Sequence, residues 1–478
     1  MNLSYENLSK NDRQHHLVLG VIVISALLLR IVQIDREPLW TDEALTLIIK
    51  NSPIFDLFFK PIDPTGGLYY FLSKIVPDGA SGTVARLPSV VFGTGSVAAM
   101  YWLARAALTS RLSLVAAAMV AVCPALVDFS QEARSYSLLI FLVILSTGAL
   151  LHWAKEGRSW QLALFGGTSV LALYTHFTAA FWIGPALLIG LDVADRLNKR
   201  RAYLIAVASM AAASSPELLR TYNHAVYIGT LAFVEVPSAR DGLSIIGNTL
   251  TPFGTTGIIA LIVYLCLRWK KVASMQHHAM AVALVLASIP LIVWLFSHLV
   301  TPIFMSRTVL LGIPGILLLL LIVERKDDWP LGSTVFVLGS VAFLLIHGTT
   351  REKEPWHKIA ADLRSNLRAG DGILICPGFS APALIHALNG TAHPVFLTLN
   401  KEIASLDSRV GWERRYLLLN RWRLEGRPRS TRMLTPARIW IVEQGCEQKS
   451  VVRDWLGGEP ASKLFVSQPT YRLVVRPN

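Results

Sequence analysis

The sequence is poor in charged residues, which make up 16% of its 478 positions. A typical soluble domain contains roughly 25% charged residues, so this scarcity argues against a soluble protein. The chain also lacks a P-loop, a GxGxxG segment after a predicted strand and an HExxH motif. ATP-driven transport and zinc proteolysis therefore have no support in the sequence.

Cysteine is scarce as well, with four residues and no CxxC pair. Structural zinc sites use closely spaced cysteine or histidine ligands, so a zinc protein is not indicated. Cys123 and Cys266 fall in apolar segments, whereas Cys376 and Cys446 lie in the C-terminal region. Separation in sequence does not reveal whether the latter two pair. We find no repeat of fixed period and no low-complexity tract.

Long apolar runs are abundant instead, with 53% hydrophobic residues and a mean hydropathy of +0.47. About eleven of these runs are long enough to cross a bilayer. The first has no small-residue cleavage site, so we expect a retained signal anchor. The predicted spans are about residues 16–34, 84–104, 112–127, 135–153, 160–174, 178–194, 202–218, 253–268, 278–299, 308–323 and 330–347.

The net charge of +13 does not indicate nucleic acid, because much of it lies in short connections between apolar runs. Eleven spans place all the basic connections on one side, with the N-terminus inside and the C-terminus outside, as the positive-inside rule requires. These connections contain Lys10 and Arg13; Arg105 and Arg111; Lys155 and Arg158; Arg196, Lys199, Arg200 and Arg201; Arg268, Lys270 and Lys271; and Arg325 and Lys326.

The pattern changes near residue 349 and predicts a second domain. Residues 372–376 and 438–442 resemble buried strands, and residues 356–367 and 381–388 resemble short helices. Alternating helices and strands are typical of an α/β domain. We therefore predict a polytopic α-helical membrane domain at residues 1–348 and a small extracytoplasmic α/β domain at residues 349–478.

A carboxylate pair, Asp42 and Glu43, follows the first predicted span at the membrane–water boundary. A general base is needed at this depth if the donor is a lipid-linked molecule whose reactive head lies at the surface. A solvated loop with a helix N-cap explains the same residues equally well, because Thr41, Asp42 and Glu43 precede an apolar run.

The remaining polar candidates also fall in the predicted outer connections. Asp63, Tyr69 and Tyr70 lie in the first loop, although tyrosines are also ordinary members of an interfacial aromatic belt. Glu132 and Arg134 lie between two apolar spans. They are either functional groups or residues that pair with each other or with another loop and so stabilise the structure. His176 occupies a tight turn, where a packing role is the common alternative. Arg307 opens a late span, and its guanidinium fork matches a phosphate.

The order of several segments resembles bacterial membrane glycosyltransferases of the GT-C superfamily, which are related to protein O-mannosyltransferases and the aminoarabinose transferase acting on lipid A. The segments are WTDEA, DPTGGLYY, ARLPSVVFG, DFSQEARSYSLL and YTHFT. The resemblance covers about residues 16–325, and the tail from EPWHKIAADLR resembles the periplasmic domain that often follows. One departure is Gly66-Gly67, where relatives commonly have two prolines, and we expect the glycines to loosen this loop.

This resemblance implies a polyprenyl-phosphate-linked sugar donor and an inverting transfer on the outer face of the bacterial inner membrane. Asp42 matches the position of the catalytic base, with Glu43 beside it, and Asp63 matches a second acidic position. Glu132, Arg134, His176 and Arg307 match further family positions. The acceptor is a glycolipid such as lipopolysaccharide, a glycan or a protein.

Two alternatives and one cofactor question stay open. A transporter or flippase for a lipid-linked sugar needs ionisable groups within its spans, and here these groups cluster in the loops. A non-catalytic scaffold for polysaccharide assembly needs no base at all. Some relatives bind a divalent cation such as Mg²⁺ or Mn²⁺, and Asp42, Glu43 and Asp63 could hold one, but their spacing does not require it.

Overall fold

The structure is a computed structural model. It describes residues 2–227, 234, 236–268, 277–325, 329–348, 353–368, 372–376, 380–388, 395–398, 401–403, 438–443 and 470–475. Cys446 lies outside these residues. The chain divides into two compact units, and each has its own core. The first comprises Met1–Ile34, Ile54–Leu72 and Thr83–Thr350, and the second comprises Asp35–Pro53, Ser73–Gly82 and Arg351–Asn478.

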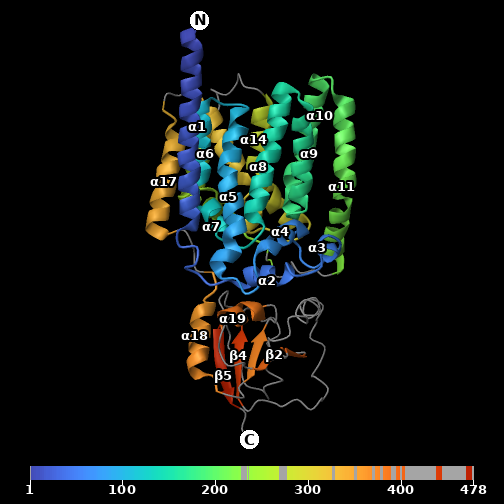
Figure 1. Cartoon of the computed structure of the whole chain (residues 1–478), viewed down its shortest axis with the longest axis vertical. Coiled ribbons are helices and arrows are strands. Elements are labelled where there is room, and N and C mark those ends of the chain that lie inside the picture. Colours follow the sequence, from blue (N-terminus) through green and yellow to red (C-terminus); the bar gives the residue numbers. More distant parts are fainter. Residues whose placement is uncertain are drawn as a thin grey trace. The chain divides into compact units, whose positions relative to one another are not determined.

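The first unit is helical, and many of its long helices run side by side (Figure 1). Its elements are α1 (Asn2–Ile31), α3 (Ile54–Phe59), α4 (Gly67–Leu72), α5 (Gly82–Arg105), α6 (Ser110–Val122), α7 (Pro124–Ser130), α8 (Tyr136–Glu156), α9 (Ser159–Leu173), η2 (Phe177–Ala179), α10 (Ala180–Arg196), α11 (Arg200–Tyr227), α12 (Ala239–Leu250), α13 (Gly254–Arg268), α14 (His277–Leu299), α15 (Ser306–Val309), α16 (Gly312–Glu324) and α17 (Leu331–His347).

The helices of this unit are those of a multi-pass membrane protein. Among the described residues, six helices are long and apolar enough to cross a membrane, or up to eight if each of two bent helix pairs forms one span. Three shorter apolar helices, α9, α16 and α17, cover the other predicted runs. All residues of α16 are buried within the protein, whereas α1 exposes apolar side chains such as Val21 and Leu28, as a lipid-facing helix does. The count of eleven crossings stays a prediction.

A fully buried arginine stabilises the break between α6 and α7, which are bent by 57°. Pro124 begins α7 and has no N–H to offer the carbonyl of Val120 four residues earlier. The Arg30 side chain of α1 replaces it, donating to the carbonyl oxygens of Val120 at 3.2 Å and Ala121 at 3.0 Å and to Ser130 Oγ at 3.1 Å. The guanidinium of Arg30 on α1 therefore stabilises the bend between α6 and α7, where the second predicted outer connection begins.

The second unit contains α2 (Thr41–Ile49), η1 (Ser73–Ile75), α18 (Trp356–Asn366), α19 (Ala381–Ala387) and a five-stranded sheet of order β3-β2-β1-β4-β5. β1 (Gly372–Cys376) pairs in parallel with β2 (Val395–Thr398) and β4 (Arg438–Glu443). The outer strands β3 (Lys401–Ile403) and β5 (Thr470–Val475) are antiparallel to their neighbours. Figure 1 shows α18, α19 and this sheet.

Several predicted boundaries agree with the structure. The predictions for α18, β1, α19 and β4 are confirmed to within one residue at each end. Two differences bear on the site. Residues 35–53 and 73–82 cluster with the C-terminal unit rather than with the membrane domain, and α11 continues to Tyr227, beyond the predicted end at residue 218.

Replacing Arg30 by methionine should destabilise the protein, because the carbonyls of Val120 and Ala121 would lose their donor in an apolar interior. Each unsatisfied group costs about 1–3 kcal/mol. The unfolding temperature in detergent is the measurement, with Arg13→Met, an exposed position on the same helix, as the control. Equal unfolding temperatures for the two variants would contradict this account.

Candidate functional site

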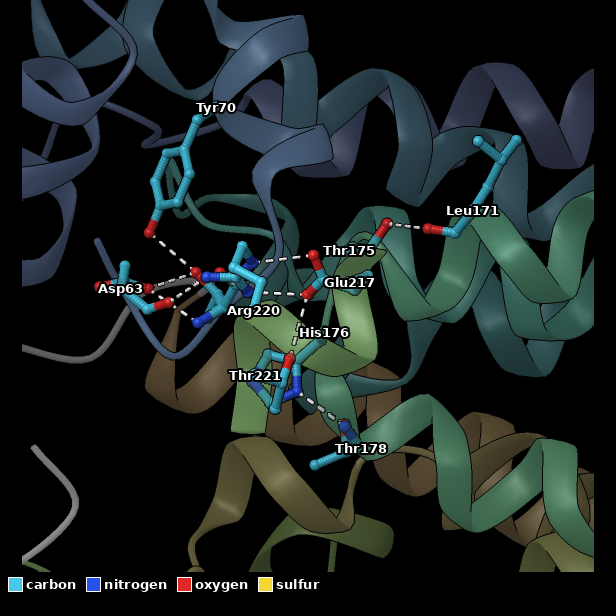
Figure 2. Close-up of polar contacts among 10 residues, drawn as sticks. Asp63, Tyr70, Leu171, Thr175, His176, Thr178, Glu217, Arg220 and Thr221 are labelled. Atoms are coloured by element: carbon cyan, nitrogen blue, oxygen red, sulfur yellow. Dashed lines mark hydrogen bonds and ion pairs between the residues drawn. The ribbon is translucent and has the colours of Figure 1, made fainter. Parts of the chain in front are cut away.

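The loop around Asp63 is ordered by its own side chains. Oδ1 of Asp63 accepts hydrogen bonds from the Thr65 N–H at 2.9 Å and the Thr65 hydroxyl at 2.5 Å, the pattern of an Asx turn. The Thr65 hydroxyl also lies 2.8 Å from the Tyr70 hydroxyl on α4 (Figure 2). Asp63 is only 9% exposed, so its carboxylate is held in the protein interior by a local network.

The same loop pairs with the turn between α9 and η2. The Gly66 N–H donates to the Thr175 carbonyl at 3.1 Å, and the Leu68 N–H donates to the Tyr174 carbonyl at 3.0 Å. A Cβ on Gly66 would lie 1.9 Å from that Tyr174 oxygen, which excludes any other residue without a backbone shift. Besides the expected loosening of the loop, the structure thus gives Gly66 a second role, since it permits a close backbone contact.

Arg220 of α11 anchors the loop from a third direction, and Figure 2 shows it beside Asp63 and Glu217. Its guanidinium donates to the Asp63 carbonyl at 2.8 Å and the Thr65 carbonyl at 2.9 Å. It also forms two hydrogen bonds with the Glu217 carboxylate, at 2.7 and 2.8 Å. Both side chains of this pair are 2% exposed. The guanidinium thus satisfies two loop carbonyls while its charge is balanced by Glu217.

Arg134 comes from the segment between α7 and α8. Its Nη1 donates to the Tyr70 hydroxyl at 3.3 Å, and its guanidinium lies 5.9 Å from the centre of the Tyr136 ring. The Arg134 carbonyl accepts from the Ser89 hydroxyl at 3.0 Å, and Ser89 in turn lies 2.7 Å from the Tyr69 hydroxyl. Tyr70 therefore touches the charged cluster, whereas Tyr69, which is 1% exposed, supports the backbone of Arg134.

These contacts set the charge of the cluster. Burial acts to raise the pKa of Asp63, but the positive charge of Arg134 and the hydrogen bonds from Thr65 outweigh it, so the pKa is lowered and the carboxylate is ionised. Burial and the Asp63 charge raise the pKa of Tyr70 well above its ordinary value. The phenol is therefore neutral and available as a hydrogen-bond donor.

His176 is held as a neutral imidazole in the turn before η2. Burial, together with the positive charges of Arg307 and Arg134, lowers its pKa to about 3. The Thr178 N–H donates to Nδ1 at 3.3 Å, with the Thr178 hydroxyl 2.8 Å away, so the proton of the neutral ring is on Nε2. The ring centre lies 5.9 Å from that of Tyr136. His176 is a hydrogen-bond donor here rather than a cation.

The predicted site residues thus divide into two groups. Asp63, Tyr70, Arg134 and His176 gather in the first unit, and the half-buried Arg307 on α15 acts on His176 through its charge. Glu132 is buried in the same connection as Arg134. Asp42 and Glu43 lie on α2 in the second unit.

Glu217 and Arg220 were not among the site residues predicted from the sequence. The predicted span ended at residue 218, so both residues fell at its edge and no role was assigned to them. The available signal was an acidic and a basic residue three positions apart on one helix face, which can pair, within a helix apolar enough to cross a membrane.

Asp63 is not part of a cluster of metal ligands among the described residues. Within the part of the chain that the structure describes, no group of three or more histidine, cysteine, aspartate or glutamate side chains could hold a metal ion. Oδ1 of Asp63 is already bonded to Thr65. Asp63 alone therefore supplies too few of the several oxygen ligands that Mg²⁺ or Mn²⁺ takes.

Comparison with known proteins agrees with this architecture. Residues 68–219 match the sequence model of the family described as dolichyl-phosphate-mannose-protein mannosyltransferase. The chain is 24% identical over 225 residues to "Putative mannosyltransferase YkcB" of Bacillus subtilis, a match that covers 44% of this chain and 31% of the relative. The match thus spans about a third of the length of this relative.

Solved structures share the fold at low sequence identity. ArnT from Cupriavidus metallidurans in the apo state has a TM-score of 0.60 at 12% identity, covering 91% of this chain and 94% of ArnT. The oligosaccharyltransferase AglB from Archaeoglobus fulgidus, in complex with an inhibitory peptide and a dolichol-phosphate, has a TM-score of 0.51 at 12% identity, covering 79% of this chain and 64% of AglB.

Replacing Arg220 by lysine should destabilise the Asp63 loop, because one ammonium group cannot reproduce the planar fork that joins Glu217 to two carbonyls. We expect a loss of about 2–5 kcal/mol in the free energy of unfolding, measured by denaturation in detergent. Arg240→Lys, at an exposed position, is the control. A loss no larger than that of the control would show that stability does not depend on the contacts of Arg220 with Glu217 and the two loop carbonyls.

The lowered pKa of His176 should make stability depend on pH in one direction. The unfolded chain protonates this histidine below about pH 6.5, whereas the folded protein resists protonation down to about pH 3. The unfolded state therefore gains protons first, and stability falls by up to about 1.4 kcal/mol per pH unit as the pH drops through this window. His176→Gln removes this component. Wild type and variant with the same slope of unfolding temperature between pH 6.5 and 4.5 would contradict the assignment.

Proposed function

Because the chain belongs to the GT-C superfamily of membrane glycosyltransferases, we propose that it transfers a sugar from a polyprenyl-phosphate-linked donor to an acceptor hydroxyl. The observation that carries the proposal is the cluster of Asp63, Arg134 and neutral His176 in irregular segments of an otherwise apolar unit. Buried ionisable groups in a membrane protein are costly and mark functional sites. Arginines are suited to a phosphate, which is the leaving group of such a donor.

In the proposed reaction the acceptor oxygen forms a bond to the anomeric carbon of the sugar. The bond from that carbon to the phosphate oxygen breaks, and its electron pair leaves with the polyprenyl phosphate. The acceptor proton passes to Asp42, the general base. Arg307 and Arg134 stabilise the negative charge on the departing phosphate. Attack from the side opposite the leaving group inverts the anomeric configuration.

The local structure of α2 supports Asp42 rather than Glu43 as the base. Glu43 is fully buried, and its carboxylate accepts the Trp40 N–H at 3.3 Å, as in a capping box. Asp42 is only half-buried, so a substrate hydroxyl can reach it. The helix-cap reading of this segment therefore applies to Glu43, and Asp42 keeps the catalytic assignment.

We place the reaction on the outer face of the bacterial inner membrane, where the distribution of basic residues puts the N-terminus in the cytoplasm and the C-terminal α/β domain outside. The acceptor is a glycolipid, a glycan or a protein. AglB was solved with a dolichol-phosphate, and a lipid phosphate is the leaving group proposed for this chain. A carrier is less well supported, because Glu217 and Arg220 bind each other and loop carbonyls.

Asp42→Asn should lower the turnover number by roughly 100-fold or more, because the amide cannot accept the acceptor proton. The assay incubates purified protein in detergent with radiolabelled polyprenyl-phosphate sugars and a lipid extract of the host, and follows the label into a new product. Asp35→Asn, an exposed aspartate of the same unit, should retain activity. Full activity in Asp42→Asn would refute the base assignment. Donor binding without transfer by wild type would favour the carrier or scaffold.

A further inference from the structure

The helix that carries Asp42 begins against a residue from the far end of the chain. Both the N–H and the hydroxyl of Thr41 donate to Oε2 of Glu354, each at 2.8 Å. The Trp356 indole N–H donates to the same oxygen at 2.5 Å. All three residues belong to the second unit and are almost completely buried. One carboxylate oxygen, 313 positions away in sequence, thus joins the first residue of α2 to the first residue of α18.

These contacts satisfy a requirement of every helix start. The first N–H groups of a helix have no partner within the helix, and a carboxylate there both accepts them and complements the helix dipole. In α2 two carboxylates accept backbone N–H groups at the helix start. Glu354 accepts at Thr41, the first helical residue, and Glu43 of the same helix accepts the N–H of Trp40 before it. Nζ of Lys353 lies 5.2 Å from the centre of the Trp40 ring, which adds a cation–π contact.

Packing fixes the orientation of the same helix. Ala44 is part of the apolar core of the second unit, together with Trp356, Ile359 and Leu384. Among the first four residues of α2, Thr41, Glu43 and Ala44 are buried, and only Asp42 is partly exposed. Asp42 therefore lies between two residues whose side chains are bonded, on a helix whose inner face is buried in the C-terminal core.

We propose that Glu354 is a positioning residue for catalysis. Acting through Thr41, it fixes the start of α2 so that the Asp42 carboxylate is held in one place for the acceptor hydroxyl. This rests on the proposed function, since it takes Asp42 as the base. It also assigns a role in the reaction to a residue of the C-terminal segment 351–478, which contributes none of the proposed reacting groups. A base displaced by about 1 Å can lose roughly 100-fold in rate.

The test compares Glu354→Ala and Glu354→Gln in the full-length protein. Glu354→Ala should lower kcat by about 10- to 100-fold, with the KM for the donor changed by less than about twofold, because Glu354 is not among the groups proposed to bind the donor phosphate. Glu354→Gln should recover most of kcat, since its amide oxygen can accept the same hydrogen bonds. Asp362→Ala removes the same charge from an exposed position on α18 and should have wild-type kinetics.

Thr41→Val provides an independent check within the same contact. It should lower kcat in the same sense and add little to Glu354→Ala, because the hydrogen bond that it removes is already lost in Glu354→Ala. Unchanged kcat in Glu354→Ala, equal losses in the alanine and glutamine variants, or full additivity with Thr41→Val would each overturn the proposal.

Hydrogen exchange separates this proposal from the proposed function. Glu354→Ala should speed amide exchange in α2 while Glu354→Gln leaves it close to wild type, whether or not the protein transfers sugar. Unchanged exchange in α2 would overturn the positioning role. Faster exchange in Glu354→Ala, combined with no sugar transfer by the wild type, would refute the glycosyltransferase assignment. It would still establish that Glu354 stabilises the start of α2.

Discussion

Backbone polar groups in apolar surroundings must all find partners within the protein, because lipid offers none. This constraint explains the buried charges of the first unit. Where Pro124 interrupts a helix, Arg30 donates to the carbonyls left open. Where the chain turns at residues 63–65, Arg220 does the same. Where α17 begins, the buried carboxylate of Glu324 accepts the N–H groups of Gly332 and Ser333. Each of these three segments is thus stabilised by one charged side chain.

In the proposed reaction, the candidate site uses this same arrangement. The Asp63 loop is bonded to Arg220 through its carbonyls and to Thr65 through its carboxylate, so the negative charge has a fixed position before any substrate arrives. Arg134 lies against Tyr70 and lowers the pKa of Asp63. Fixed dipoles and charges stabilise a transition state without reorganisation. The groups that satisfy the backbone therefore also pre-organise the surroundings of the proposed phosphate.

Hydropathy and local patterns predicted much of the fold, because apolar runs and strand or helix signals are local properties. The four predicted elements of the C-terminal region agree with the structure. The assignment of residues 35–53 to the second unit could not be predicted, since it depends on contacts between distant parts of the chain, such as that between Thr41 and Glu354 across 313 positions. Arg220 was missed for a related reason. Hydropathy ended the span at residue 218, but the helix continues to Tyr227.

The site loop also shows why a residue type does not by itself reveal rigidity. Two prolines restrict φ through their rings, and glycines in their place predicted a looser loop. Gly66 also allows the chain to approach the carbonyl of Tyr174 more closely than any side chain permits. The backbone hydrogen bonds of Gly66 and Leu68 to the turn before His176 then fix the loop. Tertiary contacts therefore supply here the rigidity that a local sequence of prolines would supply, and only the structure reveals them.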